Sequence, residues 1–291
     1  MRVAPPMTDT STEPRQKALA TVVGPSLSVI LCVNRSNPWL QEAINSVLDQ
    51  SDTDFEFLIA ANACTDEFWD ELQVIARRDQ KIRLIRTGIG QLAFNLNLLA
   101  DQASGEYLVR MDADDVCEKS RIATLRMHLA THPLDILGSA VRLIDADGRP
   151  VGMMAFPLTQ DEIVRAMKSR TVFCHPAVVI RRQFLLDIRG YLGGYYSEDT
   201  DLWLRARRNA ARMGNLPDVL LSYRIHASQS ISGGSGYAEV SAHWLRELLL
   251  QPGWFTLQGT IIAVVKAICR RLLPGSAMYK NKRAGKCGDA S

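Results

Sequence analysis

The sequence predicts an α/β protein, with a mostly parallel sheet flanked by helices and a helical extension at the C-terminal end. Three observations support this fold class. Short apolar runs alternate with segments of helical spacing through the first half of the chain. The connections between them are short, which favours parallel strands joined by helices on both faces of a sheet. With 291 residues and 47% hydrophobic content, the chain can bury a large core.

The first half of the chain contains four predicted strands with a helix in each interval. The strands span residues 27–33, 55–60, 82–86 and 107–111, and the helices span 39–50, 66–78 and 91–103. Ser36 or Asn37 is placed to cap the first helix, with Pro38 in its first turn. Open parallel sheets bind ligands beyond the carboxyl ends of their strands, so a site is expected there.

The alternation is less regular in the second half. We expect helices at about 120–131 and 161–169 and from about Thr200, strands at 136–143 and 177–180, and a turn at 145–148. Residues 1–25 are predicted to be a flexible tail, 26–232 the main domain, and 233–291 a helical, basic extension. Residues 233–236 are predicted to be a flexible joint, because three of the four are glycine.

Composition excludes some function classes. A net charge of +3 is too small to indicate nucleic acid binding, so no nucleic acid partner is expected. The six cysteines form no Cys-x-x-Cys pair and are expected to be buried thiols in a reducing compartment, at positions 32, 64, 117, 174, 269 and 287. The first 25 residues lack the apolar core of a signal peptide, so a cytoplasmic protein is expected.

An acidic cluster follows the fourth predicted strand. Asp112, Asp114 and Asp115 come directly after the segment 106–111. Side chains at i and i+2 of an extended segment point the same way, so Asp112 and Asp114 are expected to face one point. Carboxylates so close repel unless a cation lies between them, and Mg²⁺ or Mn²⁺ with phosphate oxygens suits such a site. A solvated acidic turn is the alternative.

At these segments the chain resembles the inverting, nucleotide-sugar-dependent glycosyltransferases of family 2, whose Rossmann-like fold is called GT-A. The resemblance covers about residues 27–232. It rests on four segments in the order that the family uses, namely 43–50, 103–115 with an Asp-x-Asp pattern, 198–205, and 220–226 followed by 230–232.

The resemblance implies roles for the acidic cluster. Asp112 would lie near the donor ribose and diphosphate, and Asp114 would hold a divalent cation, Mn²⁺ or Mg²⁺, with Asp115 behind them. The cation would neutralise the charge that grows on the departing nucleoside diphosphate. Arg110 would add to this field, or it would form an ordinary salt bridge with a neighbouring Asp.

The resemblance also implies a base for the acceptor hydroxyl. Asp199, in the pair Glu198-Asp199, matches the family's usual base, which must lie across the sugar from the diphosphate in a single in-line displacement. The alternative is that Glu198, Asp199 and Asp201 cap the following helix, because acids favour a helix N-terminus.

Three further residues match the family less closely, and two of them also have a structural interpretation. His226 would be a third metal ligand or a diphosphate contact, or else a structural histidine. Trp203, one helical turn after Asp199, would be a platform for a sugar ring or part of the core. His175, followed by Pro176, resembles the acceptor-side wall of the family.

The donor side departs from the family pattern. The resemblance implies nucleotide contacts from Asn34, Arg35, Asn62, Gln91 and Asn97. Gly88 and Asn95 belong to the same donor-side segment as Gln91 and Asn97. Asn95 and Asn97 could instead cap or pack. Relatives commonly have two acids where this chain has Ala61 and Asn62. An amide donates as well as accepts, so a UDP-sugar is favoured as the donor while the preference for uracil is open.

The C-terminal segment is apolar and then basic. Residues 254–273 are interrupted by Gln258, Gly259 and Lys266, which argues against a transmembrane span. The basic residues are Lys266, Arg270, Arg271, Lys280, Lys282, Arg283 and Lys286, opposed by Asp289 alone. We expect an interfacial helix on anionic lipid, and the alternative is a terminal helix packed on the domain with a basic tail.

The predicted function is metal-dependent, inverting transfer of a sugar from a nucleoside diphosphate sugar to a glycan or lipid-linked acceptor. The family's habits suggest cell-surface polysaccharide synthesis at the cytoplasmic membrane face. One alternative is an inactive module that binds sugar nucleotide or lipid, motivated by Ala61 and Asn62. The other is an aspartyl phosphatase built on Asp112 and Asp114, although such enzymes usually carry the nucleophile on the first strand.

Overall fold

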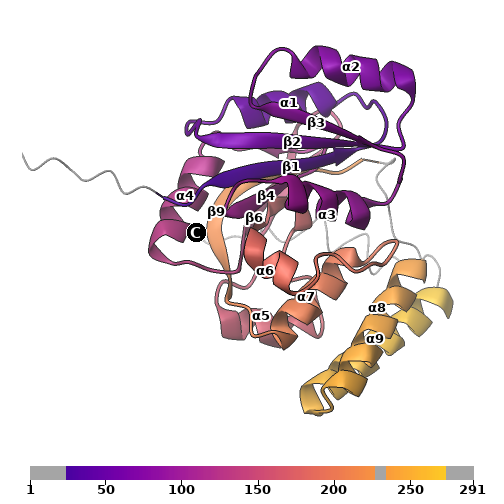
Figure 1. Ribbon diagram of the computed structural model, residues 1–291. Helices are drawn as coiled ribbons and strands as arrows, with labels where there is room; N and C mark the ends of the chain where they lie inside the picture. The colour runs from indigo at the N-terminus through magenta and orange to yellow at the C-terminus, as the bar shows by residue number, and fades with distance from the viewer. Residues whose placement is uncertain (1–23, 227–233, 273–291) are drawn as a thin grey trace, which may run out of the picture.

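The computed structural model describes residues 24–226 and 234–272. The described residues form a mixed sheet of nine strands with helices against both faces (Figure 1). The strand order is β3-β2-β1-β4-β8-β6-β9-β5, and β7 pairs with β6. The fold class predicted from the sequence is therefore confirmed, including the helices at the C-terminal end.

The first half of the chain folds as the alternation predicts. Its elements are β1 (Leu27–Val33), α1 (Leu40–Leu48), β2 (Phe55–Asn62), α2 (Asp66–Ala76), β3 (Ile82–Thr87), α3 (Leu92–Gln102) and β4 (Tyr107–Met111). All four strands are parallel, and β1 lies between β2 and β4. The strand order reverses at β1, so the carboxyl ends of β1 and β4 form a topological switch point, where sheets of this kind bind ligands.

The second half contains elements that the sequence did not predict. The structure has β5 (Val116–Cys117), α4 (Arg121–Thr131), β6 (Ile136–Ile144), β7 (Pro150–Met154), α5 (Gln160–Met167), a 3-10 turn (His175–Ala177), β8 (Val179–Arg181), α6 (Arg182–Asp187), α7 (Glu198–Arg208) and β9 (Met213–Arg224). The short β5, β7, α6 and the long β9 were not expected. The strand predicted at 177–180 starts later, and α7 starts two residues before Thr200.

Strand β9 was missed because its sequence contains strand breakers. Pro217 and Asp218 interrupt it, and β6 pairs with the residues on either side, Ser139 with Leu216 and Ala140 with Val219. The two extra residues form an irregularity in the ladder. Proline has no N–H to donate, so it is tolerated in a strand at such a point.

The C-terminal residues form a helical hairpin, α8 (Gly234–Leu250) and α9 (Trp254–Leu272). The two helices lie side by side, and α8 lies against α7 (Figure 1). The joint predicted at 233–236 is wrong for Gly234–Gly236, which form the first turn of α8, and residue 233 lies outside the described residues. Among residues 24–226 and 234–272, no helix is long and apolar enough to cross a membrane.

The core has two layers, one on each face of the sheet. Helices α1, α2 and α4 pack on one face, and α3, α6, α7 and the hairpin pack on the other. Cys117 and Cys174 are buried as expected and Cys32 and Cys64 are half-buried, but Cys269 is exposed, which corrects the prediction for that thiol. Cys287 and most of the predicted tail 1–25 lie outside the described residues.

The hairpin is closed by a glycine. A Cβ added at Gly259 of α9 would lie 2.1 Å from the ring of Trp244 in α8, so only glycine permits this contact. Although alanine favours a helix by about 1 kcal/mol over glycine, overpacking a tight contact costs about 1–3 kcal/mol.

We therefore expect Gly259→Ala to lower the free energy of unfolding, measured by urea denaturation. Gly253→Ala, which meets no atom within 4 Å, is the matched control. An equal effect of both substitutions would contradict the packing.

Candidate active site

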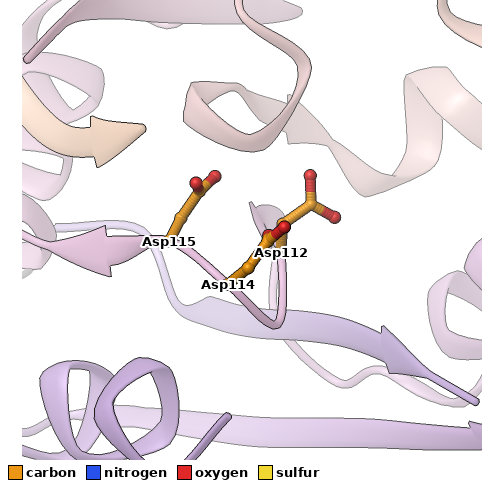
Figure 2. Close-up of side chains that lie close together, drawn as sticks. All are labelled: Asp112, Asp114 and Asp115. Atoms are coloured by element: carbon orange, nitrogen blue, oxygen red, sulfur yellow. The ribbon is translucent and has the colours of Figure 1, made fainter. Parts of the chain in front are cut away.

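Three carboxylates meet in the turn that joins β4 to β5. Ligand oxygens of Asp112, Asp114 and Asp115 all lie within 4.8 Å of one another. The three side chains extend to the same side of the turn (Figure 2). The predicted meeting of Asp112 and Asp114 is confirmed, but the reason was wrong. The chain does not stay extended after Met111. It turns at Ala113 and Asp114, and the turn brings Asp115 into the cluster.

Arg110 is ion-paired with the first of these carboxylates. Its side chain is 3% exposed, and Nη1 lies 2.5 Å from Oδ1 of Asp112. The salt-bridge interpretation of Arg110 is therefore confirmed. Burial raises the pKa values of Asp115, Glu198 and Asp199, and the charge of the Arg110 guanidinium opposes this rise in all three. One buried cation thus influences both the acidic turn and the pair of acids on α7.

Asp115 is the most constrained carboxylate of the cluster. It is fully buried, and its Oδ1 accepts a hydrogen bond from the backbone N–H of Arg224 at 2.8 Å. Its Oδ2 is also buried and has no hydrogen-bond partner among the described residues. Burial, and then the charges of Asp112 and Asp114, raise the pKa of Asp115 well above its ordinary value. A divalent cation would relieve this repulsion and satisfy the open oxygen.

The end of β9 completes the acidic turn. His226 Nε2 lies 2.9 Å from Oδ2 of Asp114, so the structure brings His226 to the cluster, and its role as a metal ligand or diphosphate contact stays a prediction. Burial and Asp112 raise the pKa of Asp114, and His226 lowers it. Arg224 donates from Nε to the backbone oxygen of Asp114 at 2.8 Å and pairs through Nη2 with Glu42 of α1 at 2.6 Å. Sequence reasoning missed Arg224, because nothing marked 213–224 as a strand.

The acids that the sequence predicts as the second part of the site lie at the N-terminus of α7. Asp199 Oδ1 accepts from the backbone N–H of Thr200 at 2.6 Å, and burial raises the pKa of Asp199. Burial, with the charge of Asp199, raises the pKa of Glu198 to about 7. Asp201 differs, because it is fully buried and paired with Arg205 at 2.8 Å and Arg246 at 2.5 Å. Of the acids predicted as one trio, Asp201 is therefore a structural residue, and Glu198 and Asp199 remain the candidate site residues.

The surroundings of Glu198 are aromatic and largely buried. His175 Nδ1 lies 3.7 Å from Oε1 of Glu198, and His175 Nε2 lies 2.9 Å from the hydroxyl of Tyr191. Burial and the charge of Arg110 lower the pKa of His175 well below its ordinary value, so its ring is neutral near pH 7. Trp203 is 3% exposed and packs on Phe173, so it belongs to the core and not to a sugar platform.

The predicted donor-side residues have different environments. Asn34 and Arg35 follow β1, are exposed, and line a cavity of about 290 Å³ with the start of α2. Asn62 ends β2 and is 7% exposed, while Gln91 precedes α3 and is exposed. Because β1 pairs with both β2 and β4, the residues that follow these strands share one edge of the sheet with Asp112.

The asparagines of α3 are already hydrogen-bonded within the protein. Asn97 accepts from the backbone N–H of Tyr191 and donates to its carbonyl, both at 2.8 Å. Asn95 is fully buried and holds the preceding loop by donating to the carbonyl oxygens of Ile89 and Gln91 at 2.7 Å. Both amides therefore hold neighbouring backbone segments in place, in agreement with the packing alternative.

A mixed sheet whose parallel strands have a switch point at β1 and β4, with an acidic turn at that point, is the arrangement of a GT-A transferase. The model of the family described as "Glycosyl transferase family 2" matches residues 28–189. The chain therefore belongs to glycosyl transferase family 2 and is a glycosyltransferase.

Individual relatives agree with this assignment. The chain is 33% identical over 227 residues to the O-antigen biosynthesis glycosyltransferase WbnJ of Escherichia coli, covering 77% of this chain and 89% of that protein. It is 25% identical over 260 residues to the Escherichia coli UDP-Gal:alpha-D-GlcNAc-diphosphoundecaprenol beta-1,3-galactosyltransferase, covering 87% and 93%. The fold resembles that of S. aureus TarS 1-349 in complex with UDP-GlcNAc, with a TM-score of 0.65, 19% identity, and coverage of 90% and 76%.

The raised pKa of Glu198 makes stability depend on pH. A carboxyl with a pKa of about 7 in the folded protein and an ordinary one of 4.5 favours folding below the ordinary pKa. This contribution is lost as the pH rises to about 7, and the loss reaches on the order of 3 kcal/mol by about pH 8. We therefore expect Glu198→Gln to be more stable than the wild type at about pH 8, with a difference that shrinks toward about pH 5.

The measurement is urea denaturation at several pH values. Glu106→Gln, at an exposed position before β4, is the control and should show no such dependence. A constant difference between Glu198→Gln and the wild type across this range would contradict the raised pKa.

Proposed function

We propose that this glycosyltransferase moves a sugar from a nucleoside diphosphate sugar, preferably a UDP-sugar, to a glycan or lipid-linked acceptor, with inversion. The main support is the convergence of Asp112, Asp114 and Asp115 in one turn beside the buried Arg110. A related protein has O-antigen biosynthesis in its name, and a structure of similar fold was solved with UDP-GlcNAc. The proposed role is the synthesis of a bacterial surface polysaccharide.

The residues of the acidic turn fit a divalent cation, Mn²⁺ or Mg²⁺. Asp112 and Asp114 offer partly exposed carboxylates, and His226 lies against Asp114. The buried Oδ2 of Asp115, without a hydrogen-bond partner among the described residues, is what a site built for a positive charge would contain. When bound, the cation supplies neutralising charge for the departing diphosphate. Asn34, Arg35, Asn62 and Gln91 would hold the nucleoside at the same edge of the sheet.

Asp199 is the proposed base for the acceptor hydroxyl. Inversion by a single in-line displacement needs a base across the sugar from the leaving group, and the N-terminus of α7 is a separate element from the acidic turn. The carboxyl of Glu198 is adjacent, with a pKa of about 7. Below that pH Glu198 is mostly protonated, so it adds little negative charge beside Asp199.

The acceptor is proposed to be lipid-linked, and the protein to lie on the cytoplasmic face of the membrane. One relative is named for transfer to a GlcNAc-diphosphoundecaprenol. The apolar and basic C-terminal segment supports the same location. The phosphatase alternative has no support, because Asp112 follows β4, the fourth strand along the chain, and not β1.

The proposal is tested by the release of nucleoside diphosphate from a panel of nucleotide sugars with and without Mn²⁺. We expect Asp199→Asn to lower kcat by about 10²- to 10⁴-fold with little change in donor affinity, because the base acts only in the transfer step. Asp114→Asn should instead abolish the gain in UDP affinity that Mn²⁺ gives, measured by calorimetry.

Asp101→Asn, an exposed carboxylate at the end of α3, is the control and should retain full activity. Tight donor binding without release of nucleoside diphosphate from any member of the panel would mean that the chain is an inactive binding module.

A further inference from the structure

One face of α9 carries large apolar side chains that stay exposed among the described residues. The face comprises Trp254, Leu257, Ile261, Val264, Val265, Ile268 and Leu272, which are between 36% and 72% exposed. They recur every three or four residues, so they form one stripe along the helix. We call this stripe the outer face of α9.

The opposite side of α9 packs on the protein through the half-buried Phe255, which contacts Trp244, and through small residues. Thr256, Gly259 and Ala263 are buried, and Gly259 lies against Trp244 of α8. Gln258 and Lys266 attach the helix to the end of α5, through Lys168 and the carbonyl of Ser169. This confirms the packed-helix alternative for one side of α9. A helix that only covered the domain would turn most of its large apolar residues inward, and here seven of them are exposed.

The charge of this part of the chain is opposite to that of the rest. Residues 251–291 contain seven Lys or Arg and one Asp, whereas residues 1–250 contain 27 Lys or Arg and 30 Asp or Glu. Within α9 itself there is no acidic residue, and Arg270 and Arg271 lie in its last turn. An apolar stripe continued by a basic segment is complementary to a surface that is apolar inside and anionic outside.

We propose that the outer face of α9 docks on an anionic lipid bilayer, with the helix in the plane of the interface. The helix is not long and apolar enough to cross the bilayer. A second copy of the chain is a poorer occupant, because α9 has no acidic residue with which the basic residues of another copy could pair across this face. This proposal deepens the proposed function. The docking itself does not depend on a lipid-linked acceptor, but its biological purpose rests on that part of the proposed function.

The test is sedimentation of the full chain with vesicles, without donor or acceptor. We expect binding to mixed phosphatidylglycerol and phosphatidylcholine vesicles that weakens with salt, and much weaker binding to phosphatidylcholine alone. Ile261→Asp combined with Val265→Asp should lower the affinity at least about tenfold, because both side chains leave water on docking. Val74→Asp, an equally exposed change on α2, should bind like the wild type.

Two results would overturn the docking proposal. One is equal vesicle binding by the wild type and the Ile261 and Val265 double variant. The other is that light scattering shows the wild type to be a dimer and the double variant to be a monomer. Release of nucleoside diphosphate in solution separates this proposal from the proposed function. A protein that binds vesicles but releases no nucleoside diphosphate fails only the proposed function, and one that releases it but ignores vesicles fails only the docking.

A second observation concerns the inner side of the hairpin. Glu239 of α8 accepts from the backbone N–H groups of Tyr195 and Tyr196, at 2.9 and 3.0 Å, and from the hydroxyl of Ser197 at 2.8 Å. Burial acts to raise the pKa of Glu239, but these hydrogen bonds hold it below its ordinary value. His243 joins the same contact, with Nε2 3.1 Å from the Ser197 hydroxyl.

The segment that Glu239 holds leads directly into Glu198 and Asp199. Just before it, Gly193 and Gly194 adopt φ angles of 135° and 109°, which other residues rarely adopt. Glycine leaves the backbone conformationally free, so contacts after Gly194 must fix where α7 begins. We infer that Glu239 is a positioning residue that sets the location of Asp199, an inference that rests on Asp199 being the base.

The test compares Glu239→Ala and Glu239→Gln by release of nucleoside diphosphate. We expect Glu239→Ala to lower kcat by about tenfold to a hundredfold with the donor KM unchanged, because the base moves and the donor side does not. Glu239→Gln keeps one acceptor oxygen and should recover part of the rate. Leu245→Ala, at an exposed position of α8, is the control.

The inference is overturned if Glu239→Ala lowers thermal stability but keeps the wild-type kcat. If Asp199→Asn is itself fully active, the proposed base is wrong, whatever Glu239 does. An inactive Asp199→Asn together with a fully active Glu239→Ala refutes the positioning role alone.

Discussion

The buried guanidinium of Arg110 is the charge on which the site depends. Burial acts against its positive charge, but Asp112, 2.5 Å away, more than offsets this, so the pKa of Arg110 is raised above its ordinary value. Its side chain is 3% exposed, and its Nε has no hydrogen-bond partner among the described residues. Without that charge, the acidic turn and the acids of α7 would lose the buried cation that favours their ionised forms.

One guanidinium does not balance the acids around it. Asp114 and Asp115 keep raised pKa values although His226 and Arg110 act to lower them. Burial of these carboxyls, together with their mutual repulsion, is the physical reason to expect a further positive charge in the turn. It also explains why the turn needs outside support, which Arg224 supplies by bonding to both Asp114 and Asp115 and by pairing with Glu42 of α1.

Sequence reasoning found the parts of the fold and site that depend on local pattern. The alternation of β1 to β4 and the acidic run at 112–115 could be predicted, because both follow from short stretches of sequence. What could not be predicted depends on distant contacts. The amide of Asn97 is engaged by Tyr191, 94 residues away, and β9 is a strand only because β6 pairs around Pro217. Trp203 was ambiguous for the same reason, since its neighbour Phe173 comes from another segment.

The C-terminal hairpin shows how the two kinds of information combine. The sequence indicated an apolar and basic helix, but it did not show which side of α9 would be free, because that is decided by the fit of Gly259 on Trp244. Once that contact fixes α9 against α8, the outer face points away from the protein, while Glu239 on α8 holds the segment before Asp199. The hairpin therefore joins the two proposals. Whatever holds α9 also restrains α8, so docking on a membrane would also restrain the proposed base, Asp199, while it brings the proposed lipid-linked acceptor within reach.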